Sequence, residues 1–83
     1  MTYFVYLIGS YKKSKVTTYA GYTNNLKNRL MLHNTGRGAK FTKGRIWKLL
    51  YYERFRTKKK AISREIYIKK NRKFRNLIKE KFA

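Results

Sequence analysis

The 83-residue sequence contains no cysteine and no proline. Without cysteine, a disulfide framework and a cysteine-based zinc site are both excluded. The apolar runs are far shorter than the roughly 18 residues of a membrane span. The opening MTYFVYLIGS also lacks the basic stretch that precedes the apolar part of a signal peptide. A chain of this length has room for one modest core. We therefore expect a single domain over residues 1–83 in a reducing, cytoplasmic setting, with no membrane association.

Acidic residues are also scarce. Three of them stand against 23 lysines and arginines, which gives a formal net charge of +20. Aromatic residues nevertheless make up 17% of the chain, a content that a disordered basic tail would not have. We expect a folded domain with a strong positive field, and such a field attracts polyanions. DNA, ribosomal RNA and anionic membrane all fit the charge alone, and nucleic acid is the favoured partner class.

The residue pattern predicts strands at residues 3–8, 16–22 and 47–55. The first has apolar side chains on both faces, so we expect it at the centre of its sheet. The polar residues 10–15 predict a rather long hairpin loop. Helical spacing behind N-cap residues predicts helices at 26–34, at 58–70 and from about Asn71. The order β-β-α-β-α-α predicts an α+β fold in which helices flank a small, antiparallel, three-stranded sheet.

Two charged residues are out of place in their predicted helices. Glu65 lies one turn from Ala61, inside the apolar stripe, where a carboxylate is costly unless a cation neutralises it. It would either form an ion pair with one of the many basic residues or bind a metal, and the local pattern alone favours the ion pair. Arg29 lies between Leu26 and Leu30. Its stem could cover the edge of the core, or its guanidinium could bind a phosphate, and the pattern favours neither.

His33 is the only histidine and lies one turn beyond Arg29. A lone histidine on a helix is more often structural than catalytic, and no compositional argument selects among the eight tyrosines. The glycine-bearing loop that follows the helix suits phosphate contacts. Its basic residues are Arg37, Lys40, Lys43 and Arg45. The loop lacks the P-loop pattern, so nucleotide hydrolysis of that type gains no support.

Several short motifs occur together and in a characteristic order. They are residues 4–6 (FVY), 19–21 (YAG), 23–30 (TNNLKNRL) with 33–34 (HN), 36–42 (GRGAKFT) and 61–65 (AISRE). With these motifs the chain resembles the GIY-YIG nuclease domain, most closely the short stand-alone bacterial proteins, which are related to the N-terminal domain of the excision-repair incision subunit. Two positions depart from the pattern. Phe4 stands in place of the opening glycine, and Ala20 in place of the isoleucine of the second half-motif.

The resemblance implies a divalent-metal-dependent DNA endonuclease of the bacterial cytoplasm or nucleoid. Its catalytic residues would be Tyr6, Tyr19, Arg29, His33 and Glu65, and Glu65 would bind Mg²⁺ or Mn²⁺. Arg29, the metal and the net charge would lower the pKa of a tyrosine that acts as base, although His33 could fill that role instead.

The same interpretation extends to the substrate. Tyr22 joins the four basic loop residues as an expected nucleic-acid contact. We expect salt-dependent backbone binding, weak sequence preference, selection by DNA structure and a monomeric protein. RNA also fits the charge. The main alternative is a non-catalytic, basic nucleic-acid-binding protein that keeps the fold. A ribosome-associated basic protein fits the composition but leaves Glu65 unexplained.

Overall fold

The first strand lies in the middle of the sheet, as its two apolar faces predict. The computed structural model describes residues 1–82, and the sheet order is β2-β1-β3 with both pairings antiparallel. The elements are β1 (Tyr3–Lys12), β2 (Lys15–Thr23), α1 (Leu26–Asn34), the short 3₁₀ helix η1 (Lys40–Thr42), β3 (Lys48–Phe55), α2 (Lys58–Lys70) and α3 (Arg72–Phe82). The predicted α+β class and element order are confirmed. Within residues 1–82, no helix has the length and apolar character needed to cross a membrane.

The hairpin between β1 and β2 is tighter than predicted. Lys12 pairs with Lys15, and the two residues between them, Lys13 and Ser14, have φ angles of 51° and 65°. Positive φ at both central positions gives the type I′ geometry that matches the twist of the flanking strands. The prediction of a long loop over residues 10–15 was wrong because polarity was taken as a sign of exposure. Ser10 is only 2% exposed and pairs with Thr17 inside the sheet.

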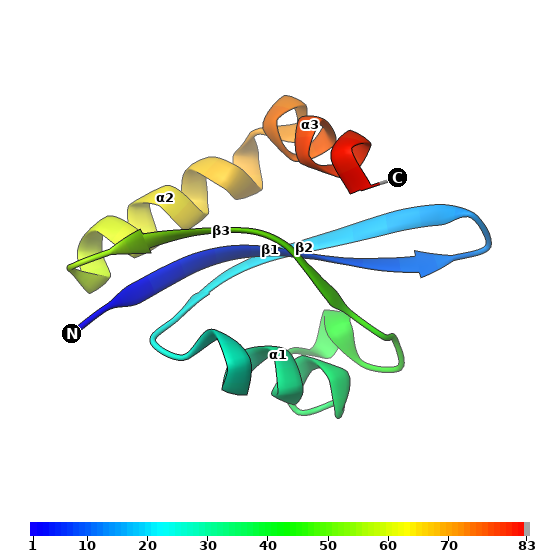
Figure 1. The fold of residues 1–83 in the computed structure, drawn as a ribbon, viewed down its shortest axis with the longest axis horizontal. Helices are drawn as coiled ribbons and strands as arrows, with labels where there is room; N and C mark the ends of the chain where they lie inside the picture. Colours follow the sequence, from blue (N-terminus) through cyan, green and yellow to red (C-terminus); the bar gives the residue numbers. More distant parts are fainter. Residues whose placement is uncertain (83) are drawn as a thin grey trace.

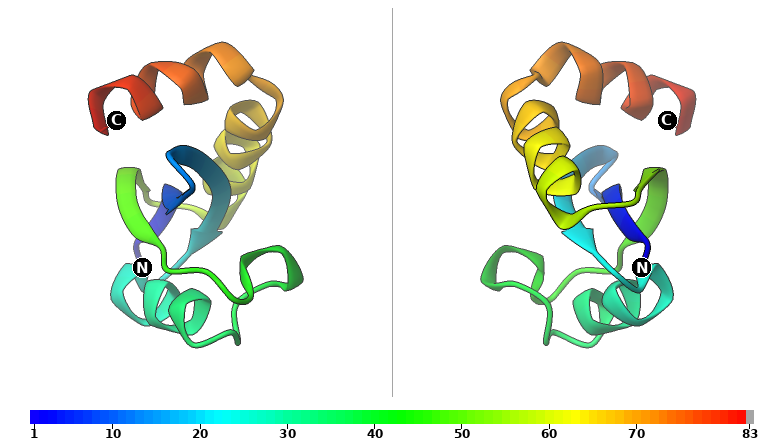
Figure 2. Two further views of the ribbon diagram at one scale, coloured as in Figure 1. Left: turned by 90° about the vertical axis from the view of Figure 1, so that its right-hand side faces the viewer. Right: turned by 90° about the vertical axis from the view of Figure 1, so that its left-hand side faces the viewer.

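Helices cover both faces of the sheet. Figures 1 and 2 show α1 on one face and α2 with α3 on the other. The sheet has a hydrophobic core on each face, and successive residues of β1 point alternately into one core and the other. Val5 and Leu7 pack with Ala61, Ile68 and Ile78 on the side of α2 and α3. Tyr6 and Ile8 pack with Trp47 on the side of α1.

An ion pair between Arg64 and Glu53 joins α2 to β3. Glu53 is one of the three acidic residues of the chain. Arg64 donates to both carboxylate oxygens of Glu53 at 3.0 and 3.2 Å, and Tyr51 donates to the same carboxylate. The Arg64 guanidinium also lies 4.6 Å from the centre of the Tyr67 ring. Burial acts to raise the pKa of Glu53, but the hydrogen bonds from Arg64 and Tyr51 outweigh it and hold that pKa below its usual value. Glu53 is therefore structural.

Candidate active site

Tyr6 lies on the central strand and faces α1. Its side chain is 2% exposed. Gly21 stands directly opposite on β2, and a Cβ atom at Gly21 would lie 2.4 Å from the Tyr6 hydroxyl oxygen. Any larger residue would displace that hydroxyl. The glycine of the second half-motif therefore provides the space that the tyrosine of the first half-motif occupies.

Helix α1 carries Arg29 and His33 one turn apart. The helix begins after Asn25, whose side chain accepts a hydrogen bond from the Asn28 backbone N–H at 3.0 Å. It ends at Asn34, and Gly36, two residues further on, has the left-handed φ of 77° that terminates a helix. Both signals are local, and the helix has the predicted bounds, 26–34. The spacing of one turn directs Arg29 and His33 toward the same region of the sheet.

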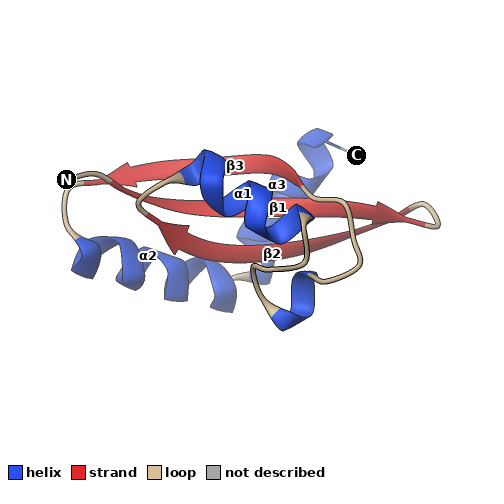
Figure 3. Cartoon of the chain, turned by 90° about the horizontal axis from the view of Figure 1, so that it is seen from below, coloured by secondary structure: helices blue, strands red, loops and turns tan. Residues whose placement is uncertain are grey.

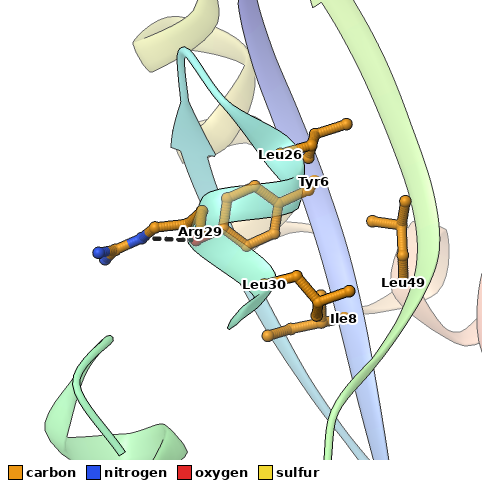
Figure 4. A pocket seen from close by; sticks show the side chains of 6 residues that line it. All are labelled: Tyr6, Ile8, Leu26, Arg29, Leu30 and Leu49. Atoms are coloured by element: carbon orange, nitrogen blue, oxygen red, sulfur yellow. Dashed lines mark hydrogen bonds between the residues drawn. The ribbon is translucent and has the colours of Figure 1, made fainter. Parts of the chain in front are cut away.

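The Tyr6 hydroxyl lies between these two side chains. Arg29 Nε donates a long hydrogen bond of 3.4 Å to Tyr6 Oη, and the same oxygen lies 2.8 Å from His33 Nε2. Figure 4 shows the terminal nitrogens of Arg29 pointing away from the tyrosine ring. Because the hydroxyl accepts from Arg29, its own proton is directed to His33 Nε2. Three of the predicted catalytic residues thus form one hydrogen-bonded cluster.

The other nitrogen of His33 meets a residue that was not among the predicted site residues. His33 Nδ1 lies 2.9 Å from Thr42 Oγ1. The Thr42 hydroxyl donates its one hydrogen to the Ala39 carbonyl at 2.9 Å, so it accepts from the histidine. We infer that the His33 proton is on Nδ1 and that Nε2 is the acceptor facing Tyr6. Both neighbours of the ring select the same tautomer.

The loop that carries Thr42 is fixed on both sides of the histidine. A Cβ atom at Gly38 would lie 2.3 Å from His33 Nδ1, so this glycine lets the loop backbone pass against the ring. The Trp47 indole N–H donates to the Thr42 carbonyl at 2.9 Å. The Asn34 side chain accepts from the Trp47 backbone N–H at 2.6 Å and donates to its carbonyl at 3.1 Å. The end of α1 and the start of β3 are tied together around the site.

Burial dominates the protonation of this cluster. Burial, with the Arg29 charge adding to it, lowers the pKa of His33, so the imidazole is neutral at neutral pH. Burial also raises the pKa of Tyr6. Arg29 opposes this effect without cancelling it, and the charges of Tyr19 and Glu65 add to the increase. Arg29 thus lowers the Tyr6 pKa as expected, but desolvation, which the expectation left out, is larger and sets the net direction.

Glu65 approaches the cluster from the other layer. Figure 3 shows α2 running alongside β2. The Glu65 side chain is 14% exposed, and its carboxylate lies 3.7 Å from Lys69 Nζ on the next turn. Lys69 in turn lies 6.0 Å from the centre of the Tyr19 ring. Tyr19 packs edge-on against His33, with 5.3 Å between ring centroids. Glu65 therefore forms the ion pair that the local pattern favoured. Its partner, Lys69, lies beside Tyr19.

The space around Tyr6 shows where a substrate has access. The cavity in Figure 4, between α1 and β3, measures about 10 Å³ and has room for one water molecule at most. Open grooves lie along β2 instead, and two of them are lined by predicted site residues. The first measures about 450 Å³ and is lined by Tyr3, Tyr22, Thr23, Asn24, Arg29 and Lys58. The second measures about 380 Å³ and is lined by Thr18, Tyr19, Ala20, Phe41, Lys69 and Arg75.

The predicted nucleic-acid contacts are divided between these grooves and the outer surface. Tyr22 lines the first groove together with Arg29. Arg37, Lys40 and Lys43 are exposed and line neither groove. Arg45 is half-buried, and its Nη1 atom is buried with no hydrogen-bond partner among residues 1–82.

Three side chains of the second groove were missed by the sequence analysis: Phe41, Lys69 and Arg75. Phe41 lies within the 36–42 motif, but nothing in the sequence places its ring beside the tyrosines, and the two basic residues are among 23 lysines and arginines. Thr42 was also missed, although it lies within the 36–42 motif. Only the fold brings these residues to the tyrosines.

The family is decided by comparison with known proteins. Residues 2–79 match the GIY-YIG catalytic domain family. The chain belongs to this family. It is 48% identical over 68 residues to a UPF0213 protein of Clostridium perfringens, covering 81% of this chain and 70% of that protein. It is 55% identical over 53 residues to a UPF0213 protein of Bacillus licheniformis, covering 63% and 55%.

A solved structure supports the same assignment. The solution NMR structure of a UPF0213 protein from Bacillus halodurans is 33% identical, covers 98% of this chain and 86% of that one, and has a TM-score of 0.52. The predicted resemblance to short stand-alone GIY-YIG proteins is confirmed. GIY-YIG domains are of the nuclease type and are generally dependent on a divalent metal.

The donors at the site fit a hard cation that keeps its own waters. Within residues 1–82, no three His, Cys, Asp or Glu side chains come together, so Glu65 is the carboxylate available beside the tyrosines. Mg²⁺ commonly binds through one or two carboxylates, phosphate oxygens and water. Zn²⁺ takes three or four protein ligands, drawn from Cys, His, Asp and Glu. The donors beside the tyrosines therefore fit a cation that keeps most of its waters better than they fit zinc.

Proposed function

We propose that this chain is a divalent-metal-dependent endonuclease that hydrolyses DNA phosphodiester bonds. The observation that carries the proposal is the hydrogen-bonded cluster of Tyr6, Arg29 and His33, with Tyr19 and the Glu65 carboxylate beside it. A structural role would be sufficient to explain a buried tyrosine. It would not account for an arginine whose terminal nitrogens point away from that tyrosine, or for a largely buried carboxylate whose charge acts on the same tyrosine.

Each residue has a distinct role in the proposed reaction. Arg29 binds the non-bridging oxygens of the scissile phosphate through its terminal nitrogens. Tyr6 passes its proton to His33 Nε2 and takes one from the attacking water, so Tyr6 and His33 act together as the general base. Tyr19, which is more exposed than Tyr6, orients the water. A Mg²⁺ or Mn²⁺ ion held by Glu65 would supply positive charge at the phosphate.

The hydrogen bond between Tyr6 and His33 allows Tyr6 to lose its proton although burial raises its pKa. Release of the Tyr6 proton to bulk solvent is unfavourable in this buried position. Transfer across a 2.8 Å hydrogen bond to a neutral imidazole creates no net charge in the pair. His33 is fully buried and would reach the attacking water only through Tyr6. It is therefore a positioning residue that accepts the Tyr6 proton.

Binding would rest on charge. A net charge of +20 favours backbone contacts, which carry little sequence information and weaken with salt. Tyr22 would contact the strand in the first groove. Arg37, Lys40, Lys43 and Arg45 would add phosphate contacts from the loop. The same charge opposes self-association, so we propose a monomer acting in the cytoplasm.

The test is cleavage of branched, nicked, duplex and single-stranded DNA with Mg²⁺ or Mn²⁺. We expect wild-type protein to cut at least one of these substrates. Glu65→Gln, Arg29→Lys and Tyr6→Phe should each lower the rate by about 10²-fold or more. Glu80→Gln is the matched control, because Glu80 is an exposed acid on α3. Cleavage that survives Glu65→Gln would locate the site elsewhere. Tight, salt-sensitive binding without any cleavage would support a non-catalytic binding protein.

A further inference from the structure

The second groove has an exposed aromatic ring at its wall. The Phe41 side chain is 56% exposed, although phenylalanine is usually buried. Its ring stacks on Tyr19, with 5.9 Å between centroids and 21° between planes. It also lies at a tilt against Trp47, 6.4 Å away. One face of Phe41 is packed against the site, and the residue still leaves a large apolar surface in the solvent.

The backbone holds this ring in place before any ligand arrives. Phe41 lies in η1, between an exposed lysine and the fully buried Thr42. Thr42 is fixed through its carbonyl by the Trp47 indole and through its hydroxyl by His33. In Figure 3 the loop between α1 and β3 carries this short helix to the β2 side of the sheet. A preset aromatic ring loses little conformational freedom when it binds a ligand.

Basic side chains lie across the groove from the ring. Lys69 and Arg75 line the same 380 Å³ space as Phe41. Arg75 is held in position because it donates to the Ile68 carbonyl at the end of α2, at 2.8 Å. A neighbouring groove shares Thr18 and Arg75 and continues the basic lining along α3. Its other lining residues are Val16, Thr17, Arg72, Asn76 and Lys79.

An aromatic wall facing a basic wall fits a nucleotide, with its flat apolar base and its charged phosphate. The space is also of the size that small ligands occupy. A base inside a duplex is covered on both faces by its neighbours, so its ring face is not available to Phe41. We propose that Phe41 and Tyr19 form a stacking platform for one unpaired base beside the scissile phosphate, with Lys69, Arg75 and the α3 residues holding the adjoining phosphates. This makes single-stranded nucleic acid the preferred substrate class, and it rests on the proposed function.

The test is a binding measurement without metal, in a Glu65→Gln background, so that it does not depend on cleavage. The probes are one short DNA strand containing the fluorescent base 2-aminopurine, the same strand in a duplex, and the RNA strand of the same sequence. We expect the single strand to bind more tightly than the duplex, with quenching of the 2-aminopurine by stacking. Phe41→Ala should weaken single-strand binding by about 5- to 100-fold and abolish the quenching. Duplex binding should change less than about twofold, because it rests on backbone charge.

Matched variants separate stacking from packing. Phe41→Trp should keep both affinity and quenching, whereas Phe41→Leu, which keeps an apolar side chain but has no ring, should behave like the alanine variant. Ile46→Ala removes a 73% exposed apolar residue of the same loop and should have no effect. Circular dichroism checks that each variant is folded. Equal losses on single strand and duplex, or full quenching in Phe41→Leu, would overturn the proposal.

The two proposals fail separately. Selective stacking without cleavage by wild-type protein would leave the platform standing and remove the endonuclease function. Cleavage by wild-type protein, together with unchanged single-strand binding and quenching in Phe41→Leu, would do the reverse. An equal or larger effect on the RNA strand would assign the platform to RNA.

Discussion

Replacing Thr42 with valine keeps the side-chain volume and removes one buried hydroxyl. That oxygen lies 2.9 Å from His33 Nδ1, accepts from the Ala39 N–H at 3.1 Å and donates to the Ala39 carbonyl at 2.9 Å. The Ala39 carbonyl keeps a second donor, the Thr42 backbone N–H at 3.2 Å. The variant therefore leaves two groups without their acceptor, the Ala39 N–H and the His33 Nδ1–H.

An unpaired buried group costs about 1–3 kcal/mol. Because Ala39 is only half-buried, its N–H should contribute at the low end, and the free energy of unfolding should fall by about 2–4 kcal/mol. For a domain of this size each kcal/mol corresponds to roughly 4–8 °C in Tm, which gives a decrease of roughly 8–32 °C. Urea unfolding followed through the single tryptophan, Trp47, which is 2% exposed, measures the change. Thr42→Ser keeps the hydroxyl and should lose only about 1 kcal/mol, the value of one buried methyl group.

The same variant should change the tautomer of the histidine. The chain has one histidine, so a ¹⁵N NMR spectrum of the ring nitrogens refers to His33 alone. Wild-type protein should show the proton on Nδ1. In Thr42→Val the proton should move to Nε2, where it would donate to Tyr6 and prevent that nitrogen from accepting the tyrosine proton. Cleavage should then fall by about 10²-fold, and Thr42→Ser should stay close to wild type. A wild-type spectrum with the proton on Nε2 would refute the reasoning, as would a valine variant with unchanged tautomer and rate.

Three further predictions follow from other contacts. Gly38→Ala should lower cleavage at least about tenfold, because its Cβ atom would lie 2.3 Å from His33 Nδ1. Gly44→Ala is the control, because a Cβ atom there would meet nothing within 4 Å. It should cost some stability through the φ of 76° but leave the rate unchanged. Glu53→Gln should lower the free energy of unfolding by about 1–2 kcal/mol at pH 7. Because the folded pKa of Glu53 is depressed, its contribution is complete above its ordinary pKa and lost as the pH falls through the folded value, so the two unfolding curves, measured against pH, should converge in acid. Arg72→Ala should reduce the slope of log affinity against log salt by about 0.7, as one lost phosphate contact would, in a titration with single-stranded DNA.

Most of the fold could be predicted from local features of the sequence, such as helix-capping residues and the alternation of apolar side chains. The helices at 26–34 and 58–70 have the predicted bounds, because Asn25 and Thr57 cap them with their own side chains. The central place of β1 followed from its two apolar faces. The hairpin was mispredicted because strand pairing with a neighbour, and not polarity, decides whether Ser10 is buried.

Residue patterns alone singled out two members of the candidate site, and the family resemblance added Tyr6, Tyr19 and His33. Glu65 and Arg29 stood out in their helices, and the structure places both beside the tyrosines. The raised pKa of Tyr6 and the role of Thr42 could not be predicted in this way. Both depend on contacts between residues far apart in the chain, 27 residues for Tyr6 with His33 and nine for His33 with Thr42. Burial, which sets the direction of both pKa shifts, is a property of the folded domain.

Four of the five glycines divide into two kinds, and the division bears on function. Gly36 and Gly44 have φ near 77°, and a Cβ atom at either would meet nothing within 4 Å, so they serve the path of the backbone. Gly21 and Gly38 do not have positive φ, and a Cβ atom at either would collide with Tyr6 Oη or His33 Nδ1. These two glycines thus leave space for the two polar groups of one hydrogen-bonded pair. A fold that needed only to bury a tyrosine and a histidine could use larger apolar neighbours and gain stability from them. The absence of side chains at these two positions therefore supports a role for the Tyr6–His33 pair in proton transfer as well as in packing.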